Sequence, residues 1–227
     1  MKPSPAAERN PVGSHVKVGR GLVEAFRAAC VDSGIRVWVH APYLVNLGSP
    51  TPATYERSVA SVAHNLARTA ALGAEGVVVH TGSCIDEGSL APAMRQVREG
   101  LLPVLDALAG DSPWLLLEPT AGQGRSLCAG VEDLAAYLDA LDRLVEVAGA
   151  GRLRLVHAND SKDVRGSSRD RHERIGDGHI GTGAFTELLE HPSTEGVPLV
   201  LETPGSGEPA SPCLPLLQKL RDAAGAR

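Results

Sequence analysis

The sequence has few aromatic residues, few cysteines and no excess of positive charge. Phenylalanine, tryptophan and tyrosine make up 3% of the 227 residues, so the core must be built from alanine, valine and leucine. The formal net charge of −5 excludes an overall basic field that would attract nucleic acid, although a local basic rim stays compatible with it. The four cysteines form no C-x-x-C pair, which is typical of reduced thiols in a cytosolic protein.

Several common signatures are also missing. No apolar run is long enough to cross a bilayer, and the start of the chain does not have the pattern of a signal peptide. No G-x-G-x-x-G follows the first predicted strand and no G-x-S-x-G surrounds a serine, so neither a dinucleotide-binding sheet nor a serine hydrolase is supported. We therefore expect a cytoplasmic protein without a membrane partner, with a flexible tail at 1–11 and a single domain at 12–227.

Six short apolar runs predict buried parallel strands. They are continuous rather than alternating and end in loop signals, and they cover 12–18, 36–41, 76–81, 114–119, 153–158 and 199–204. Between them, apolar residues at three- and four-residue spacing predict helices over 22–33, 55–72, 90–108, 131–148, 182–189 and 215–224. Alternating strands and helices predict a parallel sheet with its helices outside.

A side chain that can bind metal stands at the carboxyl end of five of these strands. They are His40, His80, Glu118, His157 and Glu202. In an α/β barrel such ends converge on one mouth, whereas in an open sheet they spread along an edge. Any one of them is explained as a polar residue capping a loop. Five at equivalent positions favour a shared metal cluster, because buried imidazoles and carboxylates cost free energy unless they are paired or metal-bound. The sequence therefore predicts a TIM-barrel-like α/β fold with a metal site at its mouth.

The loop that follows His157 is rich in acids, histidines and cations. Asp170 and His172 are two residues apart, so in an extended segment both point the same way, which suits chelation of one ion. A solvated charged loop is the alternative. The loop also carries five cations that suit a phosphate ligand beside a metal, with an ion-paired surface loop as the alternative: Lys162, Arg165, Arg169, Arg171 and Arg174.

The loop that follows His40 contains two further candidates for substrate contact. Tyr43 and Asn46 lie in the segment HAPYLVNLGSP, where they either touch a substrate or fix the loop. Together with the loop cations, we expect the substrate-binding set to be Tyr43, Asn46, Lys162, Arg169 and Arg171.

Taken together, six segments resemble the endonuclease IV (deoxyribonuclease IV) family of apurinic/apyrimidinic endonucleases, within the xylose-isomerase-like barrels. They are GSHVKVGRGL, HAPYLVNLGSP, VVVHTGS, LLLEPTAGQG, LVHANDSKDVRGSSRDRHERIGDGHIG and LVLETP. The resemblance implies a zinc-dependent barrel of DNA base-excision repair. Such an enzyme cuts double-stranded DNA on the 5′ side of an abasic site and leaves a 3′-hydroxyl. It also implies up to three zinc ions, with Mn²⁺ as a substitute, and a metal-held hydroxide as the nucleophile.

Carried over residue by residue, the resemblance implies a role for each candidate ligand. It makes His40 and His80 ligands of a first zinc, with Glu118 bridging to a second. It makes His157 and Glu202 further ligands of the second ion, and it gives the third ion Asp170 and His172. Glu118 is also implied as the catalytic residue that holds or orients the hydroxide.

The chain departs from the family pattern in two places. The family has eight strand–helix units, and this sequence predicts six. One strand and a DNA-contacting loop are absent between the first two predicted strands. A strand that would supply an aspartate to the second site and a histidine to the third is absent between Glu118 and His157. Because strand number, tilt and shear are linked, a six-stranded chain must leave its barrel gapped, re-pair its strands or be unstable alone.

Two alternatives to a repair nuclease remain. Related barrels that isomerise or epimerise sugars also place histidine and glutamate around a divalent metal, although the arginine-rich loop suits a phosphodiester better. A non-catalytic remnant that binds metal or DNA without cutting is the other alternative, and the two absent units favour it.

Overall fold

Parallel strands alternate with helices through the part of the chain that the computed structural model describes, which is 19–80, 82–84, 89–118, 153–164, 167, 169–205 and 212–225. The first half runs α1 (Arg20–Asp32), β1 (Trp38–His40), α2 (Pro52–Leu72), β2 (Gly76–His80), α3 (Leu90–Asp106) and β3 (Trp114–Glu118). The second half runs β4 (Val156–Ala158), β5 (Asp160–Ser161), β6 (His172–Glu173), α5 (Gly181–Glu190), a short 3₁₀ helix η2 (Pro192–Thr194), β7 (Leu199–Leu201) and α6 (Cys213–Gly225). The predicted tail at 1–11, strand at 12–18 and helix at 131–148 lie outside the described residues.

The first sheet has the strand order β1-β2-β3, and all its pairs are parallel. Its register sets His40 beside Val78 and His80 beside Glu118. Since parallel neighbours end at the same edge of a sheet, the last residues of the three strands lie together.

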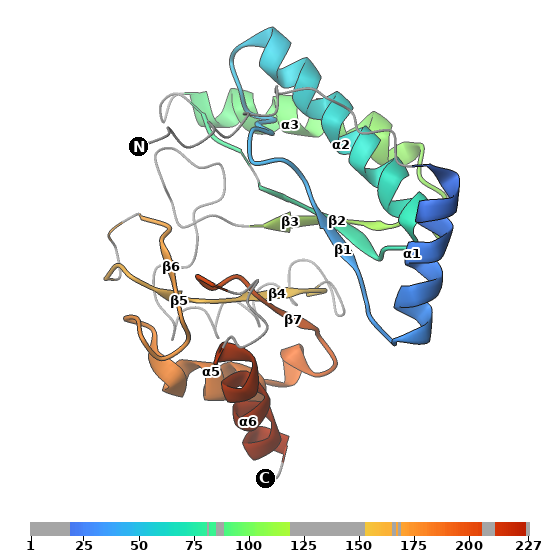
Figure 1. The fold of residues 1–227 in the computed structure, drawn as a ribbon. Helices are drawn as coiled ribbons and strands as arrows, with labels where there is room; N and C mark the ends of the chain where they lie inside the picture. The colour runs from blue at the N-terminus through green and yellow to red at the C-terminus, as the bar shows by residue number, and fades with distance from the viewer. Residues whose placement is uncertain are drawn as a thin grey trace, which may run out of the picture.

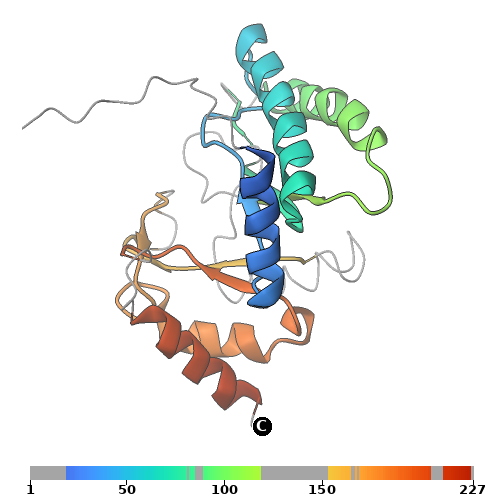
Figure 2. The ribbon, with the colours of Figure 1, turned by 45° about the vertical axis from the view of Figure 1, so that its right-hand side comes forward.

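The second half contains a parallel pair, β4 with β7, and a short antiparallel pair, β5 with β6. Among the described strands, the two parallel sheets share no backbone hydrogen bonds. Figures 1 and 2 show α1, α2 and α3 on the outer side of the first sheet, and α5 and α6 on the outer side of the β4–β7 pair. This arrangement agrees with the predicted barrel of reduced size, in which the helices surround the strands.

Each half has its own hydrophobic core. The first core is built by α2, α3, β2 and the loop after β1, with buried Val62, Leu66, Val77, Val79 and Leu101. The second is built by β4, α5 and α6, with buried Val156, Ala158, Phe185, Leu188 and Leu217. The two clusters have no residue in common. Burial of these aliphatic side chains stabilises each half from within.

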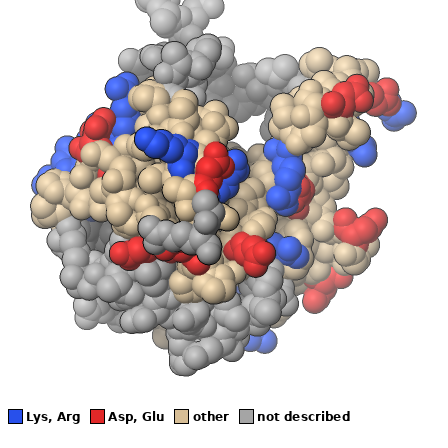
Figure 3. Space-filling view, turned by 90° about the horizontal axis from the view of Figure 1, so that it is seen from below, with Lys and Arg blue, Asp and Glu red and all other residues tan. Residues whose placement is uncertain are grey.

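The surface shows no dominant charge on the face that Figure 3 presents, where acidic and basic side chains are interspersed. This agrees with the modest negative net charge of the sequence. Within the described residues, no helix has the length and apolar character that a membrane crossing requires.

Candidate metal centre

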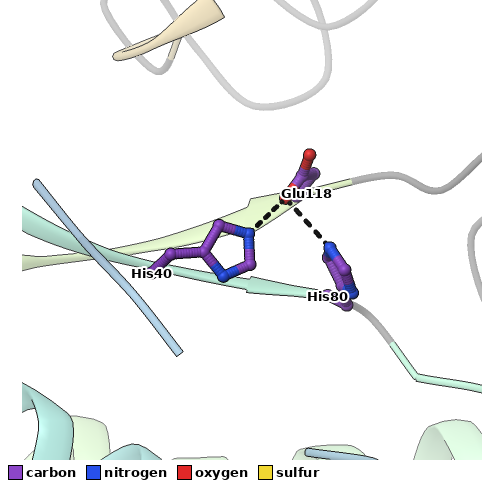
Figure 4. A group of neighbouring side chains, drawn as sticks. All are labelled: His40, His80 and Glu118. Carbon is purple, nitrogen blue, oxygen red and sulfur yellow. Dashed lines mark hydrogen bonds and ion pairs between the residues drawn. The ribbon is translucent and has the colours of Figure 1, made fainter. Parts of the chain in front are cut away.

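The carboxyl ends of the strands bring five predicted ligand side chains to one place. His40, His80 and Glu118 are the last residues of β1, β2 and β3. His157 lies in β4, and Glu202 follows β7 directly. Figure 4 shows the two imidazoles of the first sheet pointing toward the Glu118 carboxylate. The parallel register of each sheet therefore gathers that sheet's own members of the centre at one edge.

Glu118 is the shared member of two groups of metal-capable side chains. His40 Nε2 and His80 Nε2 lie 3.1 and 3.3 Å from Glu118 Oε2. His157 Nδ1 lies 2.7 Å from Glu118 Oε1 and 3.3 Å from Glu202 Oε2. In each group the ligand atoms lie within 4.8 Å of one another. Two cations could therefore sit side by side, with one carboxylate reaching both.

A hydrogen bond to the backbone fixes the orientation of the His40 ring. Its Nδ1 donates to the carbonyl oxygen of Ala41 at 2.8 Å, which leaves Nε2 as the nitrogen that faces Glu118. The His80 ring stands edge-on to the His40 ring, with 5.1 Å between their centroids. Such a hydrogen bond to the outer nitrogen is the usual way in which proteins fix the tautomer of a metal-binding histidine.

The electrostatics of the centre are those of a cation site. Burial raises the pKa of Glu118, but hydrogen bonds from His157 and His40 outweigh this and hold the pKa well below its ordinary range. Burial lowers the pKa of His157, while Glu118 and Glu202 raise it to about 9. Without a metal, a proton on His157 thus offsets part of the charge of the two carboxylates. Three imidazoles and two carboxylates are donors that suit Zn²⁺, and a divalent ion would take over that balancing charge.

The predicted pair Asp170 and His172 also lies together. His172 Nε2 is 3.1 Å from Asp170 Oδ1, and His172 Nδ1 donates to the Glu202 carbonyl oxygen at 2.7 Å. The hydrogen bond that His172 donates to Asp170 raises the pKa of His172, although burial opposes it. The pair is therefore tied through the Glu202 backbone to the group that contains His157.

The two predicted substrate residues after β1 have different environments. The side chain of Tyr43 is exposed, as is that of its neighbour Leu44, each at 76%, and the Tyr43 ring lies 5.6 Å from the His80 ring. The Asn46 amide instead joins two loops, accepting at Oδ1 from Gly48 N and Ser83 N and donating from Nδ2 to Ser83 Oγ. The Asn46 geometry favours the alternative of fixing the loop.

Three of the five predicted cations of the long loop form ion pairs. Arg171 makes two contacts with Asp163, at 2.7 and 2.5 Å. Arg169 lies 3.9 Å from Asp163, and Lys162 lies 3.7 Å from Glu173. These pairs match the ion-paired surface loop that the sequence analysis gives as the alternative to phosphate binding. Phosphate contact by these residues stays a prediction. Arg165 lies outside the described residues.

The structure shows two residues near the centre whose roles the sequence analysis does not predict, Leu44 and Asp160. Leu44 is an exposed apolar residue in the loop after the predicted ligand His40. Its position beside Tyr43 is the feature of the sequence that could have marked it as a candidate for substrate contact. Asp160 is completely buried, although it stands in a loop full of charged residues. Acidic residues are almost never fully buried, so the sequence predicts an exposed Asp160. Nothing in the local pattern distinguishes Asp160 from its exposed neighbours.

Comparison with known proteins places this arrangement in a family. The model of the xylose isomerase-like TIM barrel family matches residues 5–147 and 142–224. A probable endonuclease 4 of Streptomyces coelicolor is 43% identical over 287 aligned positions, which cover 96% of this chain and 98% of the relative. The alignment is longer than this chain of 227 residues, so the relative has positions without a counterpart here, in agreement with the absent units.

Solved structures support the same family assignment. The crystal structure of endonuclease IV from Thermus thermophilus matches with a TM-score of 0.76 and 32% identity, covering 91% of this chain and 83% of that chain. A D-tagatose 3-epimerase-like protein matches with a TM-score of 0.62 and 16% identity, covering 89% of this chain and 84% of its own, which shows a common fold alone. From these matches and the centre at the strand ends, the chain belongs to the endonuclease IV family of xylose isomerase-like TIM barrels.

Proposed function

We propose that this protein is a metal-dependent endonuclease of DNA base-excision repair that hydrolyses the phosphodiester on the 5′ side of an abasic site in double-stranded DNA and leaves a 3′-hydroxyl. The observation that carries the proposal is the Glu118 carboxylate, which reaches His40 and His80 on one side and His157 on the other. Two ligand groups that share a carboxylate are the arrangement used for in-line displacement at phosphorus. The endonuclease 4 relatives support the choice of a nuclease.

Zn²⁺ is the proposed ion, with Mn²⁺ as a substitute, and up to three ions bind per chain. His40, His80 and Glu118 would hold the first, and Glu118, His157 and Glu202 the second. Asp170 and His172 would supply two ligands of a third, and water or substrate oxygens would complete it, since zinc is commonly four-coordinate. When bound, such ions provide a hydroxide at neutral pH and neutralise charge that develops on the phosphate.

Glu118 is the proposed catalytic residue. Because its pKa lies below the ordinary range, the side chain is ionised at neutral pH and acts as an acceptor rather than as an acid. One oxygen faces His40 and His80 and the other faces His157, so the carboxylate is held in one orientation from both sides. With the ions bound, it would hold or orient the attacking hydroxide rather than remove its proton, because a carboxylate with so low a pKa is a weak base.

Contact with DNA is proposed for the exposed rim of the centre. The exposed side chains of Tyr43 and Leu44 present apolar surface, with the Tyr43 ring beside His80, and would wedge into a duplex at the gap that a missing base leaves. Lys162, Arg169 and Arg171 would approach the phosphates, and Arg171 would have to share its guanidinium between Asp163 and the phosphate.

The test is incision of a duplex that carries one abasic site, with Zn²⁺ or Mn²⁺ supplied. We expect a single cut on the 5′ side of the lesion, abolished by EDTA and reduced about 10²–10⁴-fold in Glu118→Gln, because the shared acceptor is lost. Glu75→Gln is the matched control, since Glu75 pairs with Arg36 at the far end of the first sheet. Folded, metal-loaded protein that leaves the abasic strand intact would sink the nuclease proposal in favour of a non-catalytic remnant or a sugar-active barrel.

A further inference from the structure

A buried carboxylate outside the ligand groups organises the loop that carries Asp170 and His172. Asp160 is 0% exposed and is the first residue of β5. Its side chain accepts four backbone hydrogen bonds, from the amides of Ser161, Gly176, Ile180 and Gly181, at 2.8–3.1 Å. All the donors are main-chain groups, so this carboxylate is fully used in the fold and has no role as a metal ligand.

Three of the four donors come from the segment that leads out of β6 into α5. Gly176 follows the buried Ile175, which packs in the second core, while Ile180 and Gly181 stand at the start of α5. The carboxylate thus satisfies amides that a helix start leaves without a partner, at the end where the helix dipole favours negative charge. Asp160 fixes this segment at both of its ends.

The segment also lies directly on β5. The amide of His179 donates to the Ser161 carbonyl oxygen at 2.8 Å. A Cβ atom at Gly178 would collide with Asp160 Oδ1 and with the Ser161 carbonyl oxygen, so glycine alone fits there. The chain can come this close to the carboxylate only because residue 178 has no side chain.

The same carboxylate lies across the hairpin from the strand that carries His172. In the β5–β6 pair, Asp160 is opposite Glu173 and Ser161 is opposite His172. One step further, Lys162 N donates to Arg171 O at 2.9 Å. The position of β6 is therefore set by its pairing with β5 and by the segment that follows it in the chain, which Asp160 anchors to β5. His172 Nδ1 then reaches the Glu202 carbonyl oxygen, and its Nε2 faces Asp170.

We infer that Asp160 is a positioning residue that holds β6 so that Asp170 and His172 offer their ligand atoms to one divalent cation. The inference rests on the proposed function, because it concerns the third ion of the proposed centre. Asparagine cannot replace the aspartate, since it offers one acceptor oxygen and an NH₂ group that would face backbone N–H groups. Burial makes such unpaired amides costly, so the segment would move.

The experiment measures Zn²⁺ binding by competition with a chelator and by metal content after dialysis. We expect Asp160→Asn to weaken the weakest-bound Zn²⁺ by about 10–100-fold, the usual cost of losing a group that orients a ligand. His172→Ala should weaken the same ion, and the loss in the double variant should be smaller than the sum of the two single losses, because Asp160 acts through the ligands of that ion. Asp177→Asn, the same substitution at an exposed position of the same loop, is the control and should bind Zn²⁺ as the unchanged protein does.

Gly178→Ala tests the same contact while all acids and histidines are kept, and it serves if Asp160→Asn does not fold. Unchanged Zn²⁺ affinity in the folded variants, additive losses in the double variant, or no effect of His172→Ala would each overturn the inference. Incision of abasic DNA is scored separately in the unchanged protein. A chain that binds Zn²⁺ as expected but does not cut would refute the proposed nuclease and leave the positioning role intact.

Discussion

At the scale of single residues, the pair His157 and Glu118 decides how the centre responds to pH. Their side chains lie 2.7 Å apart and half-buried, and the two carboxylates around His157 raise its pKa from 6.5 to about 9. A raised pKa in the folded state stabilises the fold below the pKa of the unfolded chain and loses this effect as the pH rises through the folded value. The same proton competes with a metal for the imidazole.

We therefore expect opposite pH trends for the metal-free and the metal-bound protein. In the presence of a chelator, the free energy of unfolding in urea should fall by up to about 3 kcal/mol between about pH 6.5 and pH 9.5. Zn²⁺ affinity should rise over the same interval, with release of a proton. His157→Gln should flatten both curves, and His64→Gln, on the exposed side of α2, should leave them unchanged. Equal pH dependence in the His157 variant would contradict this assignment.

At the scale of elements, the loop after β1 contacts the loop after β2, next to the proposed ligands His40 and His80. Gly82 has a φ of +84°, and a Cβ there would lie 2.7 Å from Asn46 Oδ1 and 3.3 Å from Leu47 N. Asn46 in turn bonds Gly48 and Ser83, so the two loops meet through one amide. His40 and His80 stand at the start of these loops, and their separation depends on this contact.

Gly82→Ala should therefore disturb both stability and metal binding. A left-handed φ at a residue with a Cβ costs about 1–3 kcal/mol, and the displaced Asn46 amide adds to it. We expect a lower midpoint in urea and roughly tenfold weaker Zn²⁺ binding, as for lost ligand support generally. Gly110→Ala is the matched control, because a Cβ there meets nothing within 4 Å. A midpoint unchanged relative to that control would show that the loops adapt freely.

At the scale of the whole molecule, the ligand groups join two halves that have separate hydrophobic cores. Glu118 belongs to the first sheet, while His157 and Glu202 belong to the second half. The ring of Trp114 also meets Arg154, with 4.1 Å between the guanidinium carbon and the ring centroid. Near that contact, residues of both halves line a cavity of about 490 Å³, away from the ligands. Bound ions would thus act on the packing of the halves as well as on substrate.

Metal removal should consequently lower thermal stability. At a free Zn²⁺ concentration about 100 times the dissociation constant, binding to the folded state alone adds about 2.7 kcal/mol. For a chain of this length we expect a melting temperature roughly 5–10 °C higher than with EDTA. Differential scanning calorimetry measures the shift, and Glu118→Gln should show a much smaller one. A metal-independent melting temperature in the unchanged protein would mean that the ions do not bridge the halves.

The sequence could predict the strands and their ends, but not how every loop folds. Parallel strands such as 76–80 and 114–118 are indicated by continuous apolar runs that stop at the ligand residue. The β5–β6 pair has two polar residues on each side and no periodic signal, so it was not predicted. The burial of Asp160 depends on amides 16 to 21 positions away, which local patterns do not report.

Because the proposed ligands are divided between two halves with separate cores, the proposed activity would depend on complete folding. The first half alone supplies His40, His80 and Glu118, which is one group, and the second group forms only when His157 and Glu202 come into contact with Glu118. A nascent or partly unfolded chain would hold one ion site at most. If the chain cuts DNA as proposed, it would gain that activity only after β7 has brought Glu202 into place.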